Sequence, residues 1–227
     1  VVRIAGNLRT IFGGNTDSRV LASAVSNLMT PPTLKVTPSS QRGFCKGRQL
    51  ALNVVDLDVY TRVHNTEFVE FLRMLGFVGV DDFPCTALYD FCNAFPTVLH
   101  EWLHLVLEVL QVPIALRRFV ISLHTSILAF SCGTGDGSFL FQVFGGVRTG
   151  CPLSALLFLL CINPFVHLFH ILADVPKLSV TRVCADDFGS ALKALKTLKI
   201  HASIFRLAVS VAGLHLKPSK CILIFSG

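Results

Sequence analysis

The chain has 227 residues, enough for one large domain or two small ones with a substantial core. Its residues are 52% hydrophobic and 15% charged, and the net charge of +6 permits a polyanionic partner without requiring one. The eight cysteines form no CxxC pair, which argues against a zinc site or a disulfide framework and favours buried free thiols in a reducing compartment.

The first 83 residues combine helical periodicity with loops. One helical pattern occupies residues 19–29, and a second runs from 47 to 74 with an interruption near His64 and Asn65. The prolines and serines of PPTLKVTPSSQRGF, residues 31–44, indicate a loop between them. We interpret this part of the chain as a separate subdomain.

From residue 84 onward, short strand-like runs alternate with long helical patterns. This alternation predicts an α/β or α+β layered structure. In chain order we predict a strand at 85–89, helices at 97–110 and from 113 to 130, a strand at 138–144, a glycine-rich loop at 145–152, an apolar helix at 153–173, a hairpin with its tip at Asp186 and Asp187, a helix at 193–211, and a closing turn and strand at 213–225.

The apolar helix at 153–173 is the best candidate for a membrane span. It contains Asn163, Pro164, His167 and His170, so its longest apolar stretch falls short of the roughly 20 residues that a bilayer needs. A buried core helix is the favoured interpretation, with a membrane protein fragment as the alternative. The N-terminus shows no signal peptide pattern, so we expect an intracellular protein of the cytoplasm and nucleus with no transmembrane segment. The chain begins without Met, which suggests a fragment of a longer protein.

Three aspartates fall at positions where strands end or turn. Asp90 follows the strand CTALY, and Asp186 and Asp187 lie in VCADDFG at the predicted hairpin tip. A cluster of three carboxylates repels itself unless divalent cations lie among them, and two such cations drive in-line phosphoryl displacement. A lone pair of aspartates more often marks a solvated turn, as we expect for Asp81 and Asp82.

Six segments in order resemble one family. They are NTDSRVLAS, SSQRGFCKGRQ, ALYDFCNAFPTVLHEWL, GVRTGCPLSALLF, CADD and GLHLKPSKC. Together they resemble the reverse transcriptase domain of non-LTR (LINE-type) retrotransposons over almost the whole chain. The resemblance implies an α+β right-hand polymerase core with helical, loop-rich fingers at 1–83. It also implies a palm at 84–227, formed by a small antiparallel sheet backed by helices, and no thumb.

The resemblance also assigns catalytic roles. Asp90 and Asp186 would bridge two Mg²⁺ ions, or Mn²⁺ in their place, with Asp187 supporting them and the carbonyl of Phe91 as a further ligand. Lys220 would protonate or neutralise pyrophosphate. The implied partners are an RNA template, a DNA primer and dNTPs, with no membrane, and with thumb and endonuclease domains elsewhere in the parent chain.

Further residues match the family's nucleotide and template sites. Arg9 would grip the triphosphate, a task suited to its fork of donors. Phe95 would exclude a 2′-hydroxyl by sterics, although core packing alone would also explain it. Thr149 and Gly150 would lie beside the nucleotide, where glycine permits close backbone approach. The template strand would contact Gln41, Arg42, Gly43, Phe44 and Arg48.

The sequence departs from the family pattern at several positions. Thr149 stands where the family has Gln, and Cys184 replaces the aromatic residue before the Ala-Asp-Asp sequence. Thr10, Asn93 and Pro96 are further differences, and none of them removes a predicted metal ligand. The expected function is RNA-directed DNA synthesis. The alternatives are a decayed relic that retains only nucleic-acid binding, and a group II intron maturase or other domesticated reverse transcriptase.

Overall fold

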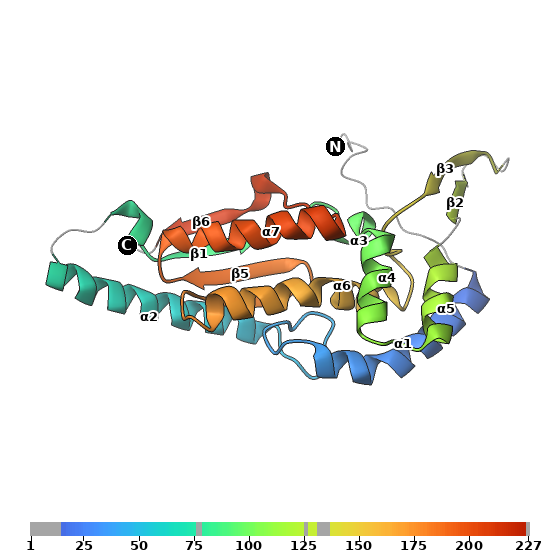
Figure 1. Ribbon diagram of the computed structural model, residues 1–227, viewed down its shortest axis with the longest axis horizontal. Coiled ribbons are helices and arrows are strands. Elements are labelled where there is room, and N and C mark those ends of the chain that lie inside the picture. The colour runs from blue at the N-terminus through green and yellow to red at the C-terminus, as the bar shows by residue number, and fades with distance from the viewer. Residues whose placement is uncertain (1–14, 76–78, 125–126, 131–136, 226–227) are drawn as a thin grey trace.

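The structure is a computed structural model that describes residues 15–75, 79–124, 127–130 and 137–225 (Figure 1). Its centre is an antiparallel sheet in the order β4-β5-β1-β6. The strands are β1 (Cys85–Tyr89), β4 (Ser179–Cys184), β5 (Asp187–Leu192) and β6 (Ile222–Phe225). The predicted α+β class is therefore confirmed. Arg9 and most of the turn that precedes the strand predicted at 138–144 lie outside the described residues.

Strands β4 and β5 form the predicted hairpin, with one difference at its tip. Cys184 pairs with Asp187, which makes Ala185 and Asp186 the turn and places Asp187 at the start of β5. We predicted both aspartates at the tip. The ladder extends one residue further because Ala185 adopts a left-handed conformation (φ 59°), which allows a two-residue turn.

One face of the sheet packs against two helices and forms the main core. Helix α6 (Ser154–Phe169) continues into a π-helical turn, η3 (His170–Asp174), and α7 (Leu198–Ala212) lies beside α6. The ring of Phe188 on β5 lies 5.6 Å from that of Phe169 and 5.9 Å from that of Phe205. Among the described residues, one helical segment, Ser154–Asp174, is long and apolar enough to cross a membrane, and most of it is buried inside the protein. This burial supports the core-helix interpretation.

The opposite face of the sheet is covered by helix α2 (Ala51–Leu75). Side chains of successive strand residues point to opposite faces, so Gly189 faces α2 while Phe188 faces the core. A Cβ at Gly189 would lie 2.6 Å from Leu57 Cδ1. The predicted interruption near His64 is wrong, because α2 is continuous there. The His64 side chain is buried on the face of α2 that packs against the end of the sheet.

Helix α1 (Thr16–Val36) is longer than the sequence suggested. It continues through Pro31 and Pro32, where we predicted a loop. Its C-terminal end is anchored to α6, because Thr37 Oγ1 donates to the carbonyl of Thr33 and accepts from Asn163 Nδ2. Tertiary contacts of this kind offset the two backbone donors that the prolines lack.

The segment between β1 and α6 is more divided than predicted. The helical region is split into α3 (Ala94–Thr97) and α4 (His100–Val109), because Val98 is buried in an extended conformation and its carbonyl accepts from Gly146. Helix α5 (Ile114–His124) ends six residues before the predicted limit. The remaining residues form β2 (Ile127–Phe130), which pairs with β3 (Phe139–Val143) in a hairpin that stands away from the main sheet (Figure 1). Three short 3₁₀ turns complete the description: η2 (Val80–Asp82), η4 (Leu195–Thr197) and η5 (Pro218–Lys220).

Candidate active site

Asp90 lies directly after β1, where the chain leaves the sheet. The backbone around it is held by the segment that precedes β6: Lys217 N–H donates to the Asp90 carbonyl at 2.8 Å, and Phe91 bridges Leu216. The Phe91 ring is buried against Phe188 at 5.6 Å. Asp90 is therefore fixed at the edge of a packed core, while its carboxylate remains 21% exposed.

The sheet register brings the hairpin aspartates to the same place. Tyr89, the residue before Asp90, pairs with Phe188, the residue after Asp187. The pKa of Asp187 is raised, first by partial burial and then by the negative charges of Asp186 and Asp90; the positive charge of Lys220 partly offsets the increase. Asp186, Asp90 and Lys220 thus all act electrostatically on Asp187, which places the four side chains in one neighbourhood. Their catalytic roles stay a prediction.

Lys220 approaches this cluster from the turn before β6. Its Nζ lies 2.6 Å from Asp90 Oδ2, and its side chain is 55% exposed. Asp90, Asp187, Cys184 and Lys220 line a cavity of about 530 Å³ that opens beside the sheet. An ammonium group beside a carboxylate cluster can neutralise charge there and can donate a proton to a leaving oxygen.

The carboxylate oxygens are the ligand type that Mg²⁺ prefers. Within the described part of the chain, no group of three His, Cys, Asp or Glu side chains lies close enough to hold a metal ion. Metal binding by Asp90, Asp186 and Asp187 therefore stays a prediction that rests on the chemistry of their carboxylate oxygens. The Phe91 carbonyl remains a prediction.

Phe95 is held between two aromatic rings. It stacks on Phe158 with centroids 4.5 Å apart and meets the edge of Phe44 at 6.0 Å. Its backbone carbonyl accepts from Val147 N–H at 2.7 Å, which docks the glycine-rich loop onto α3. Phe95 therefore packs in the core, as one interpretation predicted, and this packing also fixes its ring rigidly.

The glycine-rich loop makes its closest approach at a residue that the sequence did not single out. Gly146 has φ 89°, and a Cβ there would lie 2.5 Å from the Pro96 carbonyl oxygen. Gly150 also has a positive φ (97°) but is exposed, and Thr149 is half-buried. Gly146, the second glycine of the loop, thus serves backbone packing, while Gly150 leaves room on the solvent side.

The five predicted template residues point in different directions. Phe44 is 54% exposed, whereas Gln41 and Gly43 are buried against the β4–β5 turn. Arg48 donates to the carbonyls of Thr37, Pro38 and Gln41 and so braces its own loop. Template contact by these residues stays a prediction.

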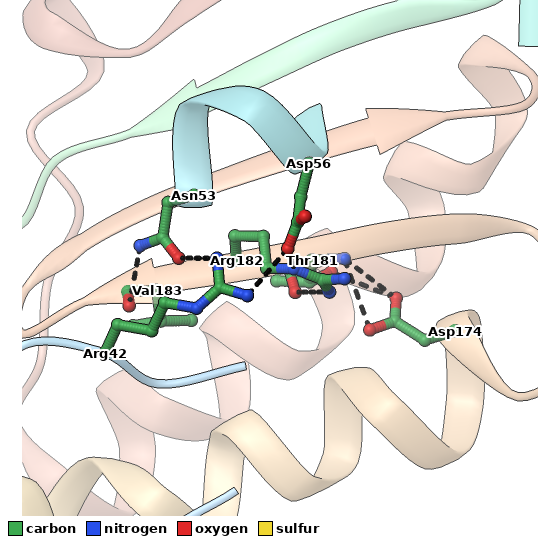
Figure 2. Close-up of polar contacts among 7 residues, drawn as sticks. All are labelled: Arg42, Asn53, Asp56, Asp174, Thr181, Arg182 and Val183. Carbon is green, nitrogen blue, oxygen red and sulfur yellow. Dashed lines mark hydrogen bonds and ion pairs between the residues drawn. The ribbon is translucent and has the colours of Figure 1, made fainter. Parts of the chain in front are cut away.

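Arg42 belongs to a polar network that the sequence did not reveal (Figure 2). Its Nη2 donates to Asp56 Oδ2 at 2.8 Å, and Arg182 Nε donates to the same oxygen at 2.6 Å. Arg42 Nη1 also donates to Asn53 Oδ1 at 2.9 Å, and Asn53 Nδ2 donates to the Val183 carbonyl at 3.0 Å. Burial alone would raise the pKa of Asp56, but the two arginines outweigh it and hold that pKa below its ordinary value.

The same network protects the outer edge of β4. Asp174 accepts from the Thr181 N–H and hydroxyl, and Arg182 Nη1 donates to the Thr181 carbonyl (Figure 2). Burial raises the pKa of Asp174, although these hydrogen bonds partly oppose it. Backbone groups that would face solvent on an edge strand are thus satisfied within the chain.

Comparison with known proteins places this site in a family. The model of the family "Reverse transcriptase (RNA-dependent DNA polymerase)" matches residues 4–225. No curated protein matches the sequence. The fold resembles apo telomerase from Candida tropicalis truncated from its C-terminal domain, with a TM-score of 0.59 and 12% identity over 91% of this chain and 40% of the telomerase.

A second similar structure is telomerase from Candida albicans in complex with a TWJ fragment of telomeric RNA. It gives a TM-score of 0.55 and 10% identity over 92% of this chain and 34% of the telomerase. The chain thus spans less than half the length of either structure. These likenesses show the fold, that of a right-hand polymerase core, and the family match covers nearly every residue. The chain belongs to the reverse transcriptase (RNA-dependent DNA polymerase) family.

Proposed function

We propose that the chain is the polymerase core of an RNA-directed DNA polymerase from a non-LTR retrotransposon polyprotein. In the reaction, the primer 3′-oxygen forms a bond to the α-phosphorus of a dNTP, and pyrophosphate leaves. The observation that carries the proposal is the cluster of Asp90, Asp186 and Asp187 beside Lys220, at the edge of an antiparallel sheet in a chain of this family. The residues 1–83 would be fingers and 84–227 the palm.

Each residue of the cluster has a chemical task in this proposal. Asp90, Asp186 and Asp187 would hold two Mg²⁺ ions, or Mn²⁺, which supply Lewis acidity and neutralise the triphosphate when bound. Lys220 reaches the cluster on an exposed side chain, so it can donate a proton to the departing pyrophosphate. Phe95, fixed by Phe158 and Phe44, would bar a 2′-hydroxyl because a rigid ring can neither move aside nor form a hydrogen bond.

The partners follow from the same reaction: an RNA template, a DNA primer and dNTPs. A telomerase of similar fold has been solved in complex with RNA, which supports an RNA partner for this chain. We further propose that the parent protein is intracellular and carries thumb and endonuclease domains. A thumb would grip the product duplex, so this core alone should add few nucleotides per binding event.

Primer extension by the purified chain tests the proposal. The assay uses an RNA template, dNTPs and Mg²⁺, and compares the wild type with Asp186→Ala. Loss of a catalytic carboxylate should reduce extension by at least about a thousandfold, while RNA affinity measured by fluorescence anisotropy stays unchanged. The matched control is Asp81→Ala, an exposed aspartate of η2 that precedes β1, at the opposite end of that strand from Asp90. Equal extension by wild type and Asp186→Ala would refute the proposal.

A decayed, RNA-binding relic is the competing function, and Cys184 and Thr149 are the observations that favour it. Cys184 lines the cavity with a small thiol where the family has an aromatic ring. A chain that binds RNA without extending primers would match the relic. Recovery of extension in the double variant Thr149→Gln/Cys184→Tyr would then locate the decay at these two positions.

A further inference from the structure

Gln41 is fully buried although it is polar and lies in a loop. Its Oε1 accepts from the Ala185 N–H at 3.0 Å and from the Gly43 N–H at 2.8 Å, and its Nε2 donates to the Ala185 carbonyl at 3.3 Å. The side-chain amide therefore satisfies both backbone groups of Ala185, as a neighbouring strand would. Ala185 is the residue immediately before Asp186.

The turn that Gln41 contacts is strained. Ala185 has φ 59°, a left-handed conformation that alanine rarely adopts because its Cβ then lies too close to a backbone carbonyl oxygen. Such a residue keeps this conformation only when its surroundings over-determine it. Ala185 is 5% exposed, so water cannot supply the hydrogen bonds that Gln41 now makes.

The loop of Gln41 is seated tightly against the hairpin. A Cβ on Gly43 would lie 2.1 Å from the Ala185 nitrogen and 2.7 Å from the Cys184 carbonyl carbon. On either side of Gln41, Val183 N–H donates to the Ser40 carbonyl at 2.9 Å, and Arg42 N–H donates to the Val183 carbonyl at 2.8 Å. Residues 40–43 thus form a continuous backbone clamp on the segment that carries the aspartates.

We propose that Gln41 is a positioning residue for catalysis: it holds the left-handed turn at Ala185 and thereby sets the placement of Asp186 and Asp187 relative to Asp90. This inference rests on the proposed function. It assigns Gln41 a role different from template contact, because no part of its amide faces solvent. The loop also carries Phe44, whose ring contacts Phe95, so one loop orders both the carboxylates and the aromatic ring of the site.

The first test is amide hydrogen exchange, which needs no catalysis. Gln41→Met keeps the length of the side chain and removes its donor and acceptor. Exchange in a peptide covering residues 183–189 should accelerate by about tenfold or more, since a protecting hydrogen bond is lost, while a peptide within α6 stays unchanged. Gln142→Met, at an exposed glutamine on β3, is the matched control and should alter neither peptide.

The second test separates positioning from template binding. In Gln41→Met, kcat for primer extension should fall by about ten- to a hundredfold because small displacements of catalytic groups are costly. RNA affinity and the KM for dNTP should stay within about twofold, as expected for a residue that touches neither ligand. Mn²⁺ binding, followed by loss of the free-ion EPR signal, should weaken in parallel with kcat. If Gln41→Met does not fold, Gln41→Glu serves instead, because it keeps the acceptor for both N–H groups. It loses the donor to the Ala185 carbonyl and, when ionised, adds a negative charge there.

The outcomes are distinguishable. A wild-type chain that extends primers beside a Gln41→Met variant with unchanged exchange and kcat would refute the role of Gln41 alone. Reduced RNA affinity at unchanged kcat would also overturn it and would make Gln41 a template ligand. A wild-type chain that neither extends primers nor binds Mn²⁺ would refute the proposed function itself, and the positioning role with it.

Discussion

Asp56 forms an ion pair with both Arg42 and Arg182, and its replacement by Asn tests the network that joins the loop, α2 and β4. The side chains of Arg42 and Arg182 are only 15% and 19% exposed, and that of Asp56 is 26% exposed. Removing one partner of a fully buried ion pair costs about 3–5 kcal/mol, and partial exposure here reduces that figure. We expect Asp56→Asn to lower the free energy of unfolding by about 2–3 kcal/mol.

Asp58→Asn is a matched control on the same helix. Its partner Arg62 lies four residues away, and the two side chains are 57% and 78% exposed, so the expected loss is about 0.5 kcal/mol or less. Urea unfolding followed by the fluorescence of Trp102, the single tryptophan, measures both variants. For a chain of this size, Asp56→Asn should also lower Tm by about 4–12 °C.

The pH dependence adds a further check. The pKa of Asp56 is lower in the folded state than in the unfolded state, so its contribution to stability is present above the unfolded pKa. That contribution is lost as the pH falls through the folded pKa. The difference in the free energy of unfolding between wild type and Asp56→Asn should therefore become smaller below about pH 4. Two results would refute the reasoning. One is an equal loss of stability in Asp56→Asn and Asp58→Asn, and the other is a stability difference between wild type and Asp56→Asn that stays constant as the pH falls.

Three other predictions concern the site and its core. Phe95→Ala should raise incorporation of rNTPs relative to dNTPs by about tenfold or more in primer extension. It should also destabilise the protein by about 3 kcal/mol, because it empties the space against Phe158. An unchanged ratio of rNTP to dNTP incorporation would assign Phe95 to packing alone. Asp187→Asn should raise the Tm of the metal-free protein at pH 7 but not at pH 3. The pKa of Asp187 is raised in the folded state, so its contribution to stability is complete below the unfolded pKa and is lost as the pH rises through the folded pKa. Asn carries no charge at either pH and avoids that loss. Burial lowers the pKa of His201 to about 4, so the unfolded chain takes up a proton first, and stability should fall as the pH decreases from about 6.5 to about 4. In urea titrations over this range, His201→Gln should flatten the slope, and an unchanged slope would contradict the assignment.

Much of the fold was predictable because local sequence patterns indicate its strands and helices. Short strand-like runs mark Cys85–Tyr89 and the two strands of the β4–β5 hairpin, and the helix over 154–169 shows an apolar run interrupted by polar residues. The placement of Asp90 at a strand end followed from that pattern. The sequence order of the six segments then indicated a reverse transcriptase domain, which the match over residues 4–225 confirms, while the non-LTR subtype stays a proposal.

Other features depend on contacts between segments that are distant in the sequence. Local propensity ends α1 at Pro31, yet Asn163 on α6 holds Thr37 and the helix continues. Propensity also extends α5 to Phe130, yet pairing with β3 converts the last four residues to a strand. In both places tertiary contacts outweigh an intrinsic preference of a few kcal/mol at most.

The residues of the candidate site divide in the same way. The sequence by itself determined which side chains are the candidates for the chemistry, since residue type and spacing predict carboxylates at a strand end and in a hairpin. Only the tertiary structure decided which residues contact the hairpin that carries two of them: Gln41 is 144 residues from Ala185, and Asp56 is 126 from Arg182. A buried glutamine and an exposed glutamine are the same residue in the sequence, because burial is decided only when the chain packs.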